Sequence, residues 1–113
     1  MIIKKADSKI EKISFRSNVW DYPMPSEQVG IAFQELDGRV PDNNWYKNTK
    51  CYEICYIISG QGKFFIEDEQ FDARVGDVVI IETNKKSYIE ARCLKMITVT
   101  RPNWYEKQCS IVE

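Results

Sequence analysis

Apolar and polar residues alternate along several short stretches of this chain. In 29–36, VGIAFQEL, Val29, Ile31 and Phe33 fall on one side of an extended backbone. Successive side chains of a strand point to opposite faces, so a period of two predicts a strand. The same reading predicts further strands at 52–59, 63–68, 71–75, 76–83, 88–93 and 94–101.

Turn-forming residues separate these stretches. Gly60-Gln61-Gly62 predicts a tight turn, EDEQ (67–70) a second turn and NKKS (84–87) a polar corner, while DGRVPDNN (37–44) reads as a linking segment. A helical period is present only weakly, in DSKIEKIS (7–14). Seven to nine short strands at regular spacing predict an all-β fold, and a jelly-roll β-barrel suits it best because closure protects strand edges and leaves a mouth for a ligand.

Length and charge limit the function classes. A chain of 113 residues predicts one domain, 1–113, with an N-terminal arm and edge strand (1–28), a barrel core (29–104) and a C-terminal tail (105–113). A net charge of −1 offers no field for nucleic acid or anionic lipid. No apolar stretch suits a membrane span or a signal peptide, so we expect a cytoplasmic protein whose four cysteines are free thiols.

Two spaced motifs carry a family resemblance. Glu53 and Gly60 lie at E-x6-G spacing within EICYIISG, and Gly76 opens GDVVIIETNKKSY after a gap of 15 residues. This pattern, over roughly residues 29–104, resembles the cupin family of small jelly-roll barrels. The resemblance implies a double-stranded β-helix and a homodimer that pairs through its sheets, with VWDYPMP (19–25) as a segment that could reach across.

The chain departs from the family at the metal ligands, because it contains no histidine. The two histidine positions of the first motif fall on Tyr46 and Asn48, or on Lys47 and Thr49. Proline, glycine, histidine and asparagine of the second motif are replaced by Glu82, Asn84, Ser87 and Ala91. Only Glu53 remains of the implied ligand set, so we expect no bound metal and no other cofactor.

Strand alternation predicts what lines the barrel mouth. If Glu53 points inward, Cys51, Cys55 and Ile57 point with it. Candidate ligand-binding residues are Tyr46, Asn48, Cys51, Cys55, Ser87, Tyr88 and Trp45. The closing strand offers either Met96, Thr98 and Thr100 or Lys95, Ile97 and Val99. The aromatic side chains could stack on a ligand ring, or they could simply plug the barrel ends.

The role of Glu53 is open at this point. A buried carboxylate needs a partner, which Lys47, Lys50 or Tyr46 could supply. Alternatively, Glu53 binds ligand hydroxyls or transfers protons as a candidate catalytic acid, or it is exposed and has no role. Three functions follow: metal-independent binding of a small polar molecule such as a sugar or sugar acid, a metal-independent isomerase, epimerase or lyase that uses Glu53 with a tyrosine or lysine, or an interaction module with a filled barrel. A metal cupin that uses Cys51, Glu53 and Cys55 is a more distant fourth.

Overall fold

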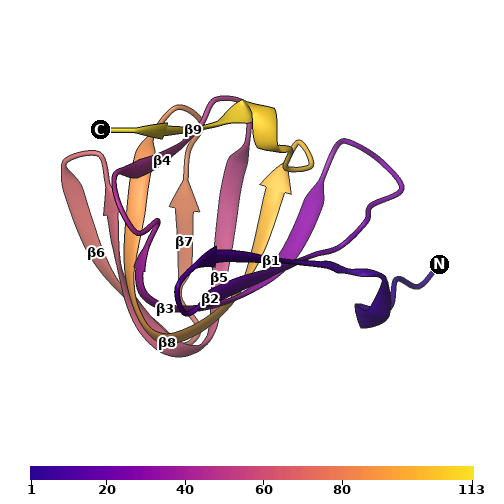
Figure 1. Cartoon of the computed structure of the whole chain (residues 1–113), viewed down its shortest axis with the longest axis horizontal. Helices are drawn as coiled ribbons and strands as arrows, with labels where there is room; N and C mark the ends of the chain where they lie inside the picture. The colour runs from indigo at the N-terminus through magenta and orange to yellow at the C-terminus, as the bar shows by residue number, and fades with distance from the viewer.

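The computed structural model describes all 113 residues as a curled sheet of nine strands (Figure 1). The strands are β1 (Lys9–Ser14), β2 (Ser17–Asp21), β3 (Gly30–Val40), β4 (Trp45–Asn48), β5 (Tyr52–Ile66), β6 (Glu69–Arg74), β7 (Val78–Ile81), β8 (Lys86–Arg101) and β9 (Cys109–Val112). Two single turns of 3-10 helix, η1 (Lys5–Asp7) and η2 (Glu106–Gln108), complete the chain. Neither has the length or the apolar character that a membrane-spanning helix needs. The fold is the predicted all-β jelly-roll barrel.

Two long antiparallel strands, β5 and β8, form the spine of the barrel. They pair from Tyr52↔Arg101 to Ile66↔Ser87, so the predicted tight turn at 60–62 is wrong, and so is the predicted division of β8 at residue 93. The register shifts where Gly60, at φ +74°, lies against Cys93, at φ +45°. Paired irregularities of this kind bend both strands without ending them. Gly60 therefore serves a sharp bend, because a Cβ there would collide with the backbone of Cys93.

The remaining strands extend the sheet on both sides of this spine. β3 and β4 pair with the second edge of β8, and β6 and β7 pair with β5. The weak helical pattern of 7–14 is overruled, because Lys9–Ser14 forms β1 and pairs with β2. The link predicted at 37–44 is shorter than expected, since β3 continues to Val40. The C-terminal β9 pairs with β4 and brings the end of the chain back to the barrel mouth (Figure 1).

Inward side chains of the two sheet halves meet in one hydrophobic core. Phe64, Ile57 and Leu94 are fully buried there, together with Leu36, Val40, Cys55, Ala73, Val79, Ile81, Ile89 and Met96. This core fills one end of the barrel. The other end, beneath β1, β2 and the C-terminal segment, is left open by smaller and polar side chains.

Candidate functional site

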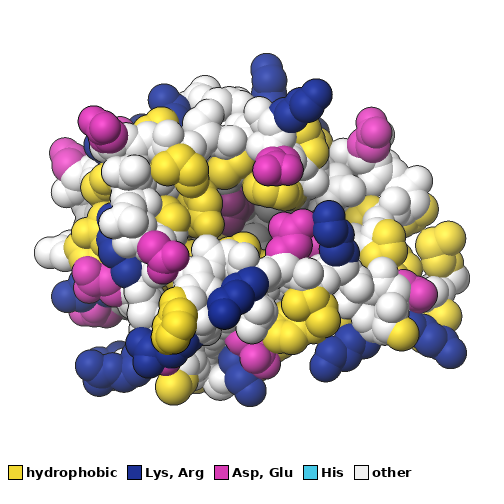
Figure 2. All heavy atoms as spheres, in the orientation of Figure 1, with side chains coloured by type: hydrophobic (Ala, Val, Ile, Leu, Met, Phe, Trp, Pro, Cys, Tyr) yellow, Lys and Arg dark blue, Asp and Glu magenta, His cyan; other side chains and the backbone are white.

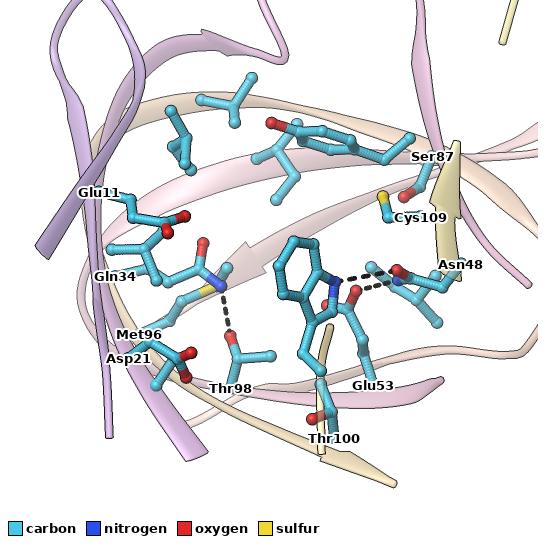
Figure 3. A pocket seen from close by; sticks show the side chains of 18 of the residues that line it. Glu11, Asp21, Gln34, Asn48, Glu53, Ser87, Met96, Thr98, Thr100 and Cys109 are labelled. Atoms are coloured by element: carbon cyan, nitrogen blue, oxygen red, sulfur yellow. Dashed lines mark hydrogen bonds between the residues drawn. The ribbon is translucent and has the colours of Figure 1, made fainter. Parts of the chain in front are cut away.

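A cavity of about 190 Å³ occupies the open end of the barrel. In the space-filling view it is the hollow near the centre of the molecule, with acidic side chains in it and at its rim (Figure 2). Strands β1, β2, β3, β5 and β8 supply its walls, and β4, β9 and Trp104 supply the side nearest the C-terminus (Figure 3). The barrel is therefore not filled by its own side chains.

Glu53 reaches this cavity because of strand alternation in β5. Cys51, Cys55 and Ile57 are 0% exposed, while Tyr52 and Ile54 are 37% and 38% exposed on the outer face. The predicted inward set is therefore confirmed. Of the two alternatives for the closing strand, the inward set on β8 is Met96, Thr98 and Thr100, since all three are buried. Glu53 lies at the edge of the core, where the cavity begins.

Asn48 is the partner of Glu53, in place of the predicted Lys47, Lys50 or Tyr46. Its side-chain Nδ2–H donates to Glu53 Oε1. The Asn48 Oδ1 accepts two hydrogen bonds, from Trp104 Nε1 at 3.2 Å and from Gln108 Nε2 at 2.7 Å. Glu53 forms no salt bridge. Its second oxygen has no protein partner, and since no buried polar side-chain atom lacks one, that oxygen is open to the cavity.

Burial dominates the electrostatics around Glu53. It raises the pKa of the Glu53 carboxyl, and the hydrogen bond from Asn48 offsets only part of this. Burial and the nearby Glu53 also raise the pKa of Cys51 and of Cys109 to about 11. Burial raises the pKa of Tyr46 to about 12. Thiols and phenol are therefore neutral near pH 7 and can offer hydrogen bonds to a ligand but no charge.

A second polar group lies across the cavity from Glu53. Gln34 Nε2 donates to Thr98 Oγ1 at 2.9 Å, and Glu11 and Asp21 lie nearby on β1 and β2 (Figure 3). Burial, followed by the charge of Glu11, raises the pKa of Asp21. The cavity lining contains no lysine, arginine or histidine. The potential inside the cavity is therefore neutral to negative.

The cavity brings together most of the residues named from the sequence. Tyr46, Asn48, Glu53, Ser87 and Tyr88 line it. Three others lie elsewhere: Cys51 and Cys55 are enclosed behind the wall, and Trp45 packs edge-on against Tyr88 with ring centroids 4.6 Å apart. Whether any of them binds a ligand stays a prediction.

Sequence reasoning missed the contributions of the two chain ends. Glu11 and Asp21 come from the N-terminal hairpin, Gln34 from β3, and Gln108 and Cys109 from the C-terminal segment. Gln108 and Cys109 are placed by the pairing of β9 with β4, which joins positions about 60 residues apart. Glu11, Asp21 and Gln34 are placed by the pairing of β1, β2 and β3. The sequence offers only a faint indication, the four-residue β-like run that follows Gln108.

The residues of this site do not fit the metal that the fold family commonly holds. No three His, Cys, Asp or Glu side chains converge to form a metal site. The side-chain amide of Asn48 already forms hydrogen bonds to three groups, on Glu53, Trp104 and Gln108. Tyr46 and Ser87 are poor anchors for a transition metal. A carboxylate and an amide that bind one another do not form a chelate.

Fold and cavity together define a histidine-free jelly-roll barrel with an open pocket, and comparisons with known proteins agree on the fold. A family model of the AraC-like ligand-binding domain matches residues 36–91. No curated protein matches the sequence significantly. The chain therefore has a cupin-type jelly-roll fold and contains no histidine.

Solved structures support this assignment of the fold. A variant of Streptomyces PAC13 with uridine is 15% identical, with a TM-score of 0.88 over 100% of this chain and 90% of that chain. PAC13 is described as a nucleoside dehydratase. KdgF from a Halomonas species is 10% identical, with a TM-score of 0.76 over 92% of this chain and 96% of that chain. Oxalate decarboxylase of Lactobacillus farciminis, in a formate complex, is 18% identical, with a TM-score of 0.76 over 94% of this chain and 34% of that chain.

Proposed function

We propose that this protein is a metal-independent cupin that binds a small, uncharged polar molecule at the mouth of its barrel. The observation that carries the proposal is Glu53. One of its oxygens is held by Asn48, and the other is open to a cavity of about 190 Å³. A concave, mostly apolar pocket with a few convergent polar groups is the usual form of a small-molecule site.

The charge of the lining narrows the ligand. A sugar acid or a phosphate needs a cation or a set of free N–H donors, and the cavity offers no lysine, arginine or histidine. Glu11 and Asp21 would repel an anion, and so would Glu53 in its charged form. Neutral sugars and nucleosides fit better than the sugar acids that the sequence left open. Among the structural relatives, PAC13 has been solved with uridine.

Aromatic side chains suit a ligand with a ring. Tyr46, Tyr88 and Trp104 all contribute to the cavity lining. Indole and phenol faces pack on sugar and base rings, and their polar ends can donate hydrogen bonds. The Trp104 N–H is already used by Asn48, so we expect that this side chain offers its ring face to a ligand.

A specific observation also favours a second candidate, an isomerase, epimerase or lyase without metal. Burial raises the pKa of Glu53, and the carboxyl groups that act as general acids in enzymes are shifted in the same direction. Tyr46 lies in the same cavity and would be the tyrosine partner. The open cavity argues against the third candidate, an interaction module with a filled barrel.

A thermal-shift screen tests the binding proposal. The panel contains neutral sugars and nucleosides, with uridine among them, and matched uronic acids and sugar phosphates, each with and without EDTA. We expect neutral compounds to raise the melting temperature regardless of EDTA, because a ligand specific for the folded state stabilises it by mass action. Stabilisation by anions alone, or only with added metal, would contradict the proposal.

The expected homodimer is a further proposal, supported by the outer face of the sheet. Ile54 and Tyr56 on β5 lie beside Ile80 and Val78 on β7 and beside Val99 and Ile97 on β8. Tyr56 is 48% exposed and Val78 53% exposed. Contiguous apolar surface of this kind marks an interface, and a second copy can cover it by two-fold symmetry. A cytoplasmic location also stays a prediction.

A further inference from the structure

The hydrogen bonds behind Glu53 fix the orientation of two side-chain amides. The backbone N–H groups of Lys50 and Cys51 point at one end of the Gln108 side chain, at 3.2 Å and 3.1 Å. A backbone N–H can only donate, so that end of Gln108 is its oxygen. The other end is therefore the NH2 group, which donates to Asn48 at 2.7 Å.

The neighbours of Asn48 fix the orientation of its side-chain amide in the same way. Its Oδ1 must face the NH2 group of Gln108 and also the indole N–H of Trp104, which is a donor only. The NH2 group of Asn48 is then turned toward Glu53 Oε1, which accepts. Asn48 is 5% exposed and Gln108 2% exposed, so water does not compete for these bonds.

This chain of bonds has a consequence for Glu53. Because Asn48 presents only N–H to Oε1, that oxygen is an acceptor in both the charged and the neutral form of the acid. When Glu53 is protonated, its hydrogen must be carried by Oε2, the oxygen that is open to the cavity. A flipped Asn48 amide would instead accept that hydrogen and turn it away from the cavity.

We propose that Gln108 and Trp104 are positioning residues, which act through Asn48 to hold one oxygen of Glu53 and leave the other as a single acid hydrogen-bond donor aimed at the ligand. The proposal rests on the proposed function for its ligand. It adds the chemistry of recognition at this point: the ligand atom that meets Glu53 is an uncharged acceptor, such as a hydroxyl, carbonyl or ring oxygen. Gln108 and Trp104 touch no reacting atom themselves.

Two other carboxyl groups, those of Glu11 and Asp21, line the same cavity on its opposite side (Figure 3), and both are present in every variant of the test below. The titratable groups that face Glu53 are Cys51 and Cys55 on its own strand, Tyr46 on β4 and Cys109 on β9. Burial raises the pKa of each of them above its ordinary value, so all four are neutral near pH 7. A change in the pKa of Glu53 therefore reports on Asn48.

Carbon-detected NMR of the glutamate carboxyl groups in ligand-free protein tests the proposal. Glu53→Gln identifies the Glu53 signal, which is then titrated in Gln108→Met, in Asn48→Leu and in the double variant. We expect the pKa of Glu53 to rise in Asn48→Leu, because the N–H that stabilises the charged form is lost. In Gln108→Met it should rise in the same direction but less far, because the Asn48 amide is free to flip.

The double variant separates positioning from a general structural effect. If Gln108 acts only through Asn48, adding Gln108→Met to Asn48→Leu leaves the pKa of Glu53 unchanged. In the wild-type protein the Asn48 side-chain amide signals should shift with the same midpoint as the Glu53 carboxyl. The proposal is overturned if Gln108→Met leaves the pKa of Glu53 unchanged. It is also overturned if Gln108→Met raises that pKa as much in the Asn48→Leu background as in the wild type.

Two features keep the test decisive. If Gln108→Met does not fold, Trp104→Phe removes one donor to Asn48 and keeps an aromatic ring; an unchanged Glu53 pKa in that folded variant also overturns the proposal. The titration needs no ligand. A thermal-shift screen without hits would therefore refute the proposed function and leave the positioning result standing. An unchanged pKa of Glu53 in the variants would refute the positioning role and leave the binding proposal standing.

Discussion

Replacing Glu53 with glutamine should change how the stability of this protein depends on pH. The side chain keeps its size, and its oxygen can still accept from Asn48. What is lost is a carboxyl whose pKa burial raises above the ordinary value of 4.5. Wild type and Glu53→Gln should therefore have the same fold, but the free energy of unfolding should depend on pH differently in the two proteins.

The sign follows from proton linkage. As pH rises above 4.5, Glu53 of the unfolded chain loses its proton, while folded Glu53 keeps it. The folded state then binds more protons, so the free energy of unfolding of the wild type falls as pH rises until it passes the folded pKa. Within that window the loss is about 1.4 kcal/mol for each pH unit, and Glu53→Gln lacks it.

Urea unfolding of both proteins, followed by tryptophan fluorescence from about pH 4 to about pH 8, measures this difference. We expect Glu53→Gln to become more stable than the wild type by a margin that grows with pH and then levels off. Glu90→Gln, which removes an exposed carboxyl from β8, is the matched control and should show no such growth. Parallel curves for wild type and Glu53→Gln would refute the reasoning.

Three other predictions follow from the fold. Phe64→Ala should cost about 3–5 kcal/mol in urea unfolding because the ring is fully buried in the core, and a loss below about 1 kcal/mol would contradict that packing. Gly60→Ala should lower the free energy of unfolding by about 1–3 kcal/mol, since φ is +74° and the new Cβ meets the Cys93 backbone. An unchanged melting temperature would contradict the predicted strain at this bend. Ile54→Lys should convert a dimer into a folded monomer in light scattering, and a wild-type monomer at micromolar concentration would remove the dimer proposal.

Local patterns predicted the strands and the inward face of β5 because both depend on nearest neighbours along the chain. The alternation from Cys51 to Ile57 decides which side chains are buried, whatever the rest of the fold does. Glu53 was placed by the same alternation once the E-x6-G spacing had singled it out. The approximate location of the cavity followed from that placement.

The bend at Gly60 shows where local patterns fail. A Gly-x-Gly sequence is typical of a tight turn, but here β5 continues through it because β8 has its own irregularity at Cys93 directly opposite. Only the long-range pairing of the two strands distinguishes a bend from a turn. The same limit applies to Gln108, whose role depends on β9 returning to β4.

The central claim is that Glu53, without a metal, binds a small neutral molecule in this cavity. Calorimetric titration tests it most directly, with the strongest neutral compound from the screen added to wild-type protein, to protein dialysed against EDTA, and to Glu53→Leu. The account predicts equal affinity for the first two and a loss of at least about tenfold in Glu53→Leu, the value of one hydrogen bond to an acid group. Affinity that vanishes with EDTA, or that survives in folded Glu53→Leu, would contradict it.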